Sequence, residues 1–184
     1  MEDLKFLLSK LNARSSEDEI EATFKSVAEK LLKEFHIVKN GRIFRLIEIE
    51  FYFCNAQHKD TITYKRTENA GRWFMHRGVD ITFNSNEKEG FYGGILIRSV
   101  IPLDSAEAIL GPEKCLWELF DDEALLPNTI YPFIEKKANG IYSGEILSRE
   151  RYHVKGEYKE SPYRFYVNGI SIVGLKNYSA NPWK

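Results

Sequence analysis

The chain opens with apolar residues at helical spacing. Leu4, Leu7, Leu8 and Leu11 recur every three or four positions, which predicts an amphipathic helix over residues 2–12. The leucines of such a helix share one face, and we expect that face to pack against the rest of the fold.

A second helical pattern begins at Ser16-Glu17-Asp18-Glu19, which has the form of a capping box. In this motif the serine hydroxyl and the glutamate carboxylate accept hydrogen bonds from backbone N–H groups that the first turn leaves free. Apolar residues follow at helical spacing, namely Ile20, Phe24, Val27, Ala28, Leu31 and Leu32. Residues 1–35 are therefore expected to be helical, and Asn40-Gly41 predicts a tight turn after them.

Residues 46–53 change to an alternating pattern, which predicts a strand whose side chains point to opposite faces in turn. One face would carry Ile47, Ile49, Phe51 and Phe53, and the other Glu48, Glu50 and Tyr52. The first face is apolar throughout and is the one to bury. The second is either a functional surface or simply the wet face of an ordinary strand.

Further strands are predicted downstream. Residues 79–83 alternate, and residues 95–101 form a buried apolar run that Pro102 closes. Near the end of the chain, residues 163–167 and 170–173 are expected to be strands joined by a turn at Asn168-Gly169.

The remaining segments are less regular. Residues 104–120 have a helical pattern that Gly111-Pro112 breaks in two, whereas residues 54–70 and 121–140 are expected to be loops. Helices followed by strands indicate an α+β fold. The length of 184 residues suits a single domain over 1–184.

Composition narrows the function classes. The formal net charge of −1 excludes a strong global attraction to nucleic acid, so such binding would need a local basic patch. The two cysteines, Cys54 and Cys115, argue for a reducing compartment and against a disulfide scaffold. Because no apolar stretch reaches membrane-spanning length, we expect a cytoplasmic protein without a membrane partner, associated with the nucleoid if bacterial.

Glu48 and Glu50 are the first candidates for chemistry. A carboxylate beside a hydrophobic core has a raised pKa, which suits a general base near neutral pH. Arg98 is the second candidate, because a guanidinium within an apolar strand needs an anionic partner. Its partner within the chain would be Glu50 or Glu48, either as a structural strut or as a functional pair.

Three rings, Tyr52, His58 and His76, could form the flat walls of a slot. Aromatic faces on two sides hold a flipped nucleobase, with each stack contributing roughly 1–3 kcal/mol. For either histidine alone, a hydrogen-bonded structural role is the simpler interpretation, and for His153 it is the only one that the sequence favours. No Cys/His spacing indicates a metal site, and no cofactor motif occurs.

Several segments in order resemble the alkyladenine (3-methyladenine) DNA glycosylase family. The strand Glu48-Ile49-Glu50-Phe51-Tyr52 is similar to that family's Glu-x-Glu-Ala-Tyr strand, and His58 follows it as the family histidine does. The other similar segments are residues 65–69, 79–84, 96–103, 111–116 and 162–169. Together they span roughly residues 40–175.

The resemblance implies the family's fold, in which N-terminal helices pack on a curved, mostly antiparallel sheet, as in the C-terminal domain of formyltransferase. It also implies a monofunctional glycosylase that needs no cofactor. Such an enzyme rotates a damaged purine out of duplex DNA and hydrolyses its N-glycosidic bond. It implies that Glu50 deprotonates the attacking water and that Arg98 holds the water and the carboxylate. The base would lie among Tyr52, His58 and His76, and Asn84 would exclude normal guanine.

The resemblance also implies contacts with DNA, for which a monomer suffices. Arg77-Gly78 lies where the family has its minor-groove wedge, usually a tyrosine before a glycine. Lys65 and Arg66 lie in a matching basic region, and Arg164 lies in the closing strand. Duplex DNA with an alkylated or deaminated purine is the expected partner.

Two other functions stay open at this point. The same fold could serve as a non-catalytic nucleic-acid-binding module, which the replaced wedge favours. A hydrolase of free nucleosides or nucleotides would need the same base and stacking pocket but no wedge, and a net charge of −1 suits it.

Overall fold

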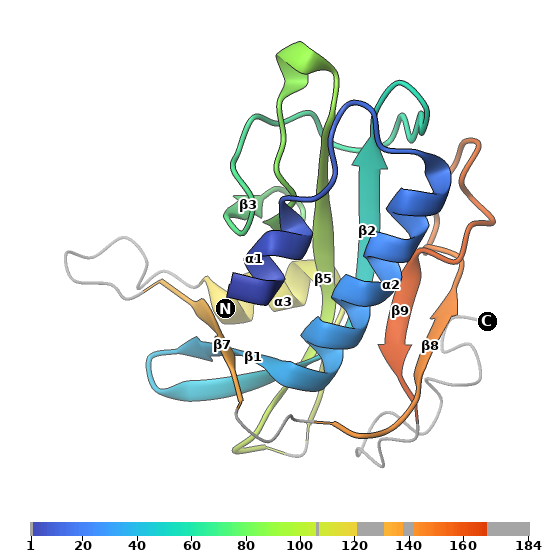
Figure 1. The fold of residues 1–184 in the computed structure, drawn as a ribbon. Helices are drawn as coiled ribbons and strands as arrows, with labels where there is room; N and C mark the ends of the chain where they lie inside the picture. Colours follow the sequence, from blue (N-terminus) through green and yellow to red (C-terminus); the bar gives the residue numbers. More distant parts are fainter. Residues whose placement is uncertain (1, 106, 121–130, 138–141, 169–184) are drawn as a thin grey trace.

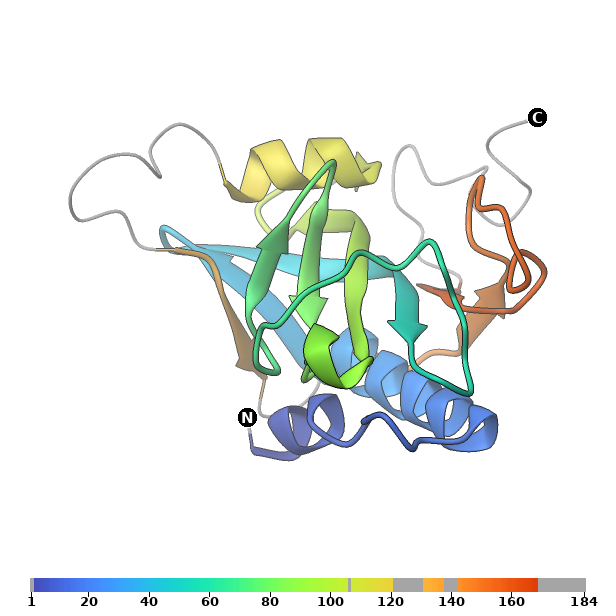
Figure 2. The same cartoon turned by 90° about the horizontal axis from the view of Figure 1, so that it is seen from above.

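The computed structural model describes residues 2–105, 107–120, 131–137 and 142–168. Within these ranges nine strands form one sheet, and every strand pair is antiparallel. The sheet curls into a half-barrel (Figures 1 and 2). The expected α+β class with a curved, antiparallel sheet is confirmed.

Three helices accompany the sheet: α1 (Glu2–Leu8), α2 (Glu17–Glu34) and α3 (Pro112–Leu119). The strands are β1 (Phe35–Lys39), β2 (Arg42–Cys54), β3 (Trp73–Met75), β4 (Val79–Thr82), β5 (Tyr92–Pro102), β6 (Ile109–Leu110), β7 (Phe133–Lys136), β8 (Ile146–Arg149) and β9 (Arg164–Val167). A single 3₁₀ turn, η1 (Glu87–Glu89), precedes β5.

The helices lie on both faces of the sheet. Helices α1 and α2 cover one face and α3 covers the other, as the view from above shows (Figure 2). The core between α2 and the sheet is aromatic: the ring of Phe24 stacks on Phe51 at 4.7 Å and lies 5.9 Å from Phe83, measured between ring centroids. The apolar face predicted for residues 46–53 is thus the face that α2 buries.

Helix α2 begins where the sequence predicts. The backbone N–H of Glu19 donates to the Ser16 hydroxyl, and the Glu19 carboxylate accepts from the Ser16 N–H, which completes the capping box. The helix ends at Glu34, and β1 starts at the next residue. Asn40 and Gly41, with φ of 49° and 78°, then form the tight turn between β1 and β2.

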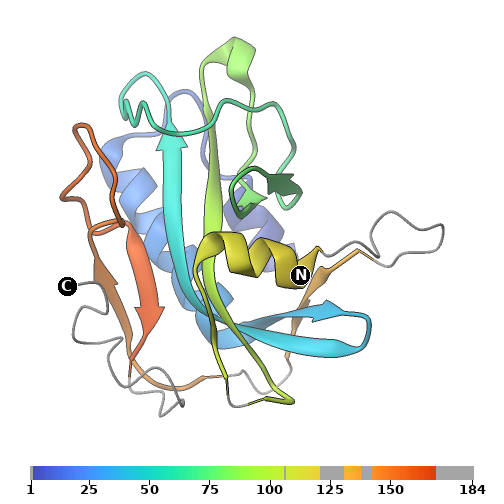
Figure 3. The same ribbon diagram turned by 180° about the vertical axis from the view of Figure 1, so that it is seen from behind.

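Strand β2 is the centre of the sheet (Figures 1 and 3). Along its length it pairs with β5, while its other edge pairs first with β1 and then with β9. The β2–β5 register shifts twice, so that Ile47 and Arg98 are each an extra residue opposite a continuous partner strand. Such bulges bend a sheet and change the direction of side chains, often beside functional sites.

Three expectations about local structure need correction. Residues 104–111 contain the short strand β6 instead of a helix, and α3 starts only at Pro112, because Gly111-Pro112 provides a helix start with proline in the first turn. Residues 133–136, expected to be loop, form strand β7 because β1 offers them an unpaired edge. The first helix ends at Leu8, before the predicted residue 12.

The expected strand over 170–173 lies outside the described residues, as does Gly169 of the turn before it. No helix within the described ranges is long and apolar enough to span a membrane.

We predict that Ser16→Ala lowers the free energy of unfolding by about 1 kcal/mol, because the first turn of α2 then loses its hydrogen-bond acceptor. Urea denaturation monitored by circular dichroism measures this. The control is Ser26→Ala, whose hydroxyl donates only to the Ala22 carbonyl of the same helix. Equal losses for the two variants would show that the cap does not stabilise α2.

Candidate functional site

The site is built on one row of residues that crosses the sheet. Asp80 of β4 pairs with Leu96 of β5, Leu96 pairs with Glu50 of β2, and Glu50 pairs with Arg164 of β9. Directly paired residues point to the same face of a sheet, so these four side chains share a face. Because Phe51 contacts α2, this is the face opposite α2.

Glu50 is 0 % exposed and is hydrogen bonded on both oxygens. Its Oε2 accepts from the Tyr52 hydroxyl at 2.8 Å and from Arg98 Nη1 at 3.3 Å. Its Oε1 accepts from the backbone N–H of Tyr152 at 2.7 Å. The face of β2 that carries Glu50 is therefore not exposed to solvent at this point, because the segment carrying Tyr152 covers it.

Arg98 joins the two glutamates of β2. Its Nη1 lies 3.3 Å from Glu50 Oε2 and its Nε lies 3.6 Å from Glu48 Oε2. The predicted pairing of Arg98 with Glu50 or Glu48 is confirmed for both residues. Burial alone would lower the pKa of Arg98, but the charges of Glu50 and Glu48 raise it above its ordinary value.

Glu48 has a different environment from Glu50. It accepts from the Ser99 hydroxyl at 3.0 Å and lies 3.5 Å from Arg164 Nη1. Burial raises the pKa of Glu48, and the cations Arg98 and Arg164 only partly oppose this.

Tyr52 acts as a hydrogen-bond donor to the carboxylate. Burial, followed by the negative charge of Glu50, raises its pKa above the ordinary value, so the hydroxyl keeps its proton. On its other side, the Arg151 guanidinium lies 4.6 Å from the centroid of the Tyr52 ring.

A cavity of about 560 Å³ opens beside this cluster. Its walls come from β2, the loop after β2, the β3–β4 turn, β5 and the segment between β8 and β9. Five rings line it, namely Tyr52, Tyr64, His76, Tyr152 and His153, together with the cations Arg66, Arg77, Arg98 and Lys155. Tyr52, Arg98 and Tyr152 are also the residues that bond Glu50, so the Glu50 carboxylate lies directly behind the cavity wall.

A buried ion pair fixes the wall between β8 and β9. Both guanidinium Nη atoms of Arg151 contact the Asp60 carboxylate, and Nη1 also donates to the carbonyl of Phe51 at 3.2 Å. This ties the 150–158 segment to β2 and to the loop after it. The next residue, Tyr152, is thereby held with its N–H on Glu50, and His153 follows in a left-handed conformation with φ of 52°.

His58 does not reach the cavity, and the expectation that it stacks on a base there is corrected. Its ring is completely buried on the α2 side, with Nδ1 2.8 Å from Glu17 Oε2 and the ring centroid 3.9 Å from that of Tyr158. The reason is a local turn: Asn55 Oδ1 accepts from the His58 N–H and directs the chain toward the start of α2.

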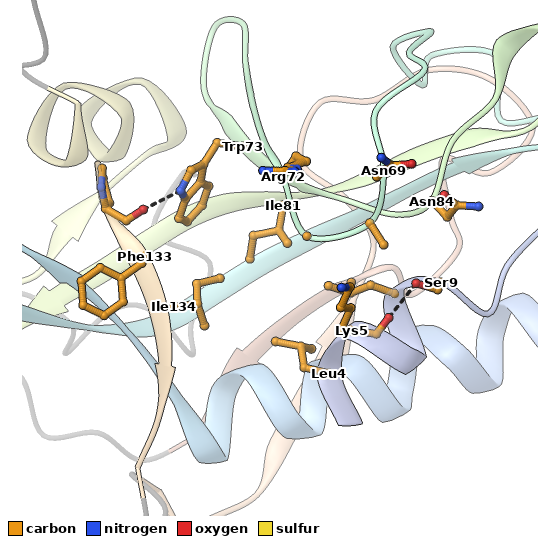
Figure 4. A pocket seen from close by; sticks show the side chains of 14 residues that line it. Leu4, Lys5, Ser9, Asn69, Arg72, Trp73, Ile81, Asn84, Phe133 and Ile134 are labelled. Atoms are coloured by element: carbon orange, nitrogen blue, oxygen red, sulfur yellow. Dashed lines mark hydrogen bonds between the residues drawn. The ribbon is translucent and has the colours of Figure 1, made fainter. Parts of the chain in front are cut away.

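Asn84 also lies elsewhere, so its predicted role at the same pocket is corrected. Strand β4 ends at Thr82, and the alternation that begins at Asp80 does not continue to residue 84. Asn84 instead lines a second cavity of about 710 Å³, between α1, the start of β3 and β7 (Figure 4). Figure 4 shows Trp73, Phe133 and Ile134 at one end of that cavity and Asn69, Asn84 and Lys5 toward the other.

The residues expected to contact DNA differ in exposure. Arg77 is exposed at the rim of the first cavity, and Lys65 is exposed but paired with Glu87 at 3.1 Å. Arg66 and Arg164 are turned inward toward Asp80 and Glu48, so their predicted surface contacts with DNA are corrected.

Gly78 is buried where the β3–β4 turn packs on β5 and α3. A Cβ atom at this position would lie 2.7 Å from Leu96 Cδ1 and 3.0 Å from Pro112 Cβ. Glycine is therefore required for close packing, and Gly78 itself presents no side chain to DNA.

Five polar or aromatic residues of the cavity were not predicted from the sequence as site residues: Tyr64, Asp80, Tyr152, His153 and Lys155. Only Asp80 carries a usable signal, since it is a carboxylate at an alternating position of a predicted strand. The others lie in irregular segments, whose course depends on tertiary contacts such as the Arg151–Asp60 pair. Within the described ranges, no group of three His, Cys, Asp or Glu side chains could hold a metal ion.

Comparison with known proteins adds little about function. No protein-family model matches the chain. An uncharacterized protein of Acanthamoeba polyphaga mimivirus is 26% identical over 189 residues, which cover 81% of this chain and 88% of that protein. The similarity thus extends over most of both chains and brings no assigned activity.

We predict that Glu48→Gln changes the pH dependence of stability. A carboxyl with a raised folded-state pKa contributes stability that is present at low pH and is lost as pH rises through the folded pKa. Relative to Glu48→Gln, wild type should therefore become more stable as the pH falls from 7 toward the ordinary value of 4.5. Urea denaturation at a series of pH values measures this difference.

The exposed residue Glu113 offers a control, since Glu113→Gln removes one charge without emptying a buried site. If wild type instead loses stability relative to Glu48→Gln as the pH falls, the folded-state pKa of Glu48 is lowered. The charges of the arginines then outweigh the effect of burial.

Proposed function

We propose that this protein is a DNA N-glycosylase that removes alkylated or deaminated purines from duplex DNA. The observation that carries the proposal is the position of Glu50. Its carboxylate is held by Tyr52, Arg98 and the Tyr152 amide, and all three residues also line the aromatic, cationic cavity.

Glu50 suits the role of general base. A carboxylate has about four acceptor positions, and three are filled by the protein, which leaves one for a water molecule. Arg98 Nη1 contacts this carboxylate and would hold the same water. Proton abstraction by a positioned base typically contributes about 10²–10⁴-fold to a rate.

The cavity suits a flipped purine. A volume of about 560 Å³ lies within the range of small-ligand sites. Tyr52 and Tyr64 supply flat faces for stacking, and the Tyr64 ring itself packs on His76, with 4.6 Å between the ring centroids. Arg77 and Lys155 are exposed at the same cavity and can meet the phosphates on either side of the flipped nucleotide.

The fold supports the same proposal. The resemblance to alkyladenine DNA glycosylases predicts helices packed on a curved antiparallel sheet, and the buried charge of Arg98 predicts a carboxylate partner such as Glu50. The structure has such a sheet, and β2 pairs with β5. The proposal includes the detailed glycosylase fold, a monomeric state and action on the DNA of the nucleoid.

One observation favours a second candidate, a nucleic-acid-binding module without catalysis. Glu50 is completely buried, so a water molecule must enter between Tyr52, Arg98 and Tyr152 to reach it. In that case the Glu50–Arg98 pair would be a strut, and the cavity would only accommodate a base.

We predict that Glu50→Gln abolishes excision while leaving DNA binding within a few-fold of wild type, because the amide fills the same space but accepts no proton. The measurement is single-turnover release of hypoxanthine, ethenoadenine or 7-methylguanine from duplex oligonucleotides, at enzyme excess. The loss should be about 10²-fold or more. Fluorescence anisotropy gives the Kd in parallel.

Glu48→Gln is the matched control, since Glu48 lies on the same strand, is also buried and also contacts Arg98. Equal losses for the two variants would show that only the charge around Arg98 matters. Wild type that binds the duplex but releases none of these bases would establish the non-catalytic module.

We further predict that Arg77→Ala weakens duplex binding and reduces the slope of log K against log salt by about one unit, as loss of one phosphate contact requires. Lys25→Ala is the control, because Lys25 is exposed on α2, which covers the opposite face of the sheet. A slope that is the same in both variants would remove Arg77 from the DNA interface.

A further inference from the structure

Three side chains in the cavity wall form a second, separate polar cluster, which we name the His76 relay: Arg66, Asp80 and His76. Asp80 Oδ2 accepts from Arg66 Nη2 at 2.8 Å, and Asp80 Oδ1 lies 2.9 Å from His76 Nε2. The side chains become more exposed along the series, from 0 % for Arg66 and 3 % for Asp80 to 16 % for His76. The cluster therefore runs from the interior to the cavity.

The inner part of the relay is rigid. The Arg66 guanidinium lies 4.0 Å from the centroid of the Phe74 ring, and its Nε donates to the Tyr64 carbonyl at 3.1 Å. Gly94 of β5 makes room for the pair, since a Cβ atom there would lie only 2.8 Å from Asp80 Oδ2. The contact with Arg66 and the close approach of Gly94 hold the Asp80 carboxylate in one orientation.

The geometry fixes the tautomer of His76. An ionised carboxylate only accepts hydrogen bonds, so Nε2 of His76 must carry a hydrogen. Nδ1 has no hydrogen-bond partner in the part of the chain that the structure describes, so it is the ring nitrogen left to contact a bound base. A histidine oriented by a buried carboxylate is a common arrangement for moving protons.

The relay faces Glu50 across the cavity floor. Asp80 and Glu50 are both paired with Leu96, one on each side of β5. Two strand spacings separate them, which is roughly 10 Å. A base and an acid at this separation can act on opposite ends of one bond.

We propose that His76 is the general acid of the site, with Asp80 and Arg66 as positioning residues. This inference rests on the proposed glycosylase function. It identifies His76 as the source of the proton that the leaving base needs. Water attacks C1′ of the sugar and gives a proton to Glu50. The C1′–N9 bond breaks, its electron pair passes to the purine ring, and the His76 Nδ1–H proton neutralises a ring nitrogen, so that a neutral base departs.

The charge of the leaving base provides the test. Hypoxanthine is neutral and leaves poorly without a proton, whereas 7-methylguanine already carries a positive charge and leaves without one. His76→Gln should therefore slow single-turnover release of hypoxanthine by about 10²-fold, and release of 7-methylguanine by less than about tenfold. Both lesions are placed in the same duplex sequence.

His153→Asn is the matched comparison, since His153 lines the same cavity without a carboxylate partner among the described residues, and asparagine tolerates its positive φ. It should change both rates in the same proportion. Addition of free imidazole should restore hypoxanthine release to His76→Ala and leave 7-methylguanine release unchanged.

Equal slowing of both lesions by His76→Gln, or no slowing, would overturn the role of His76 and leave the glycosylase proposal standing. Wild type that releases neither base would overturn both. If the variants do not fold, ¹⁵N NMR of wild-type protein still decides the geometry: the neutral His76 ring should carry its hydrogen on Nε2. A hydrogen on Nδ1 instead would rule out the relay.

Discussion

The completely buried carboxylate of Glu50 is the constraint on which the site depends. An ionised group without water must be compensated by hydrogen bonds from the protein, and an unpaired one would be very costly. Its donors come from β2 itself, from β5 and from the segment between β8 and β9. Three parts of the chain more than 40 residues apart must therefore meet at one point, and the cavity lies where they meet.

Two local features bring these three parts of the chain together. The bulge at Arg98 lets adjacent residues of β5, Arg98 and Ser99, both reach the glutamates of β2. The Arg151–Asp60 pair fixes the connection that delivers the Tyr152 amide. Both features bring hydrogen-bond donors to the buried glutamates of β2. Each also shapes a wall of the cavity that we propose receives a purine.

Prediction of which side chains lie together succeeded where neighbouring strands supply them. Glu50, Tyr52 and Arg98 lie together because strand alternation puts the first two on one face and a buried arginine requires a carboxylate. It failed for His58 and Asn84, which follow a turn and a strand end respectively. The alternation of a strand does not predict where side chains point beyond such a turn or strand end. The His58 side chain faces α2, and the Asn84 side chain lines the second cavity.

The sequence alone determined the local elements: the capped helix α2, the turn at Asn40-Gly41 and the alternating strand β2. These depend on hydrogen bonds and periodicities within a few residues. Only the tertiary structure decided that β7 is a strand, that the polar face of β2 is dry, and that His76 is joined to Asp80. Each of these depends on partners distant in sequence or on close packing such as that at Gly94, which a local pattern of residues does not encode.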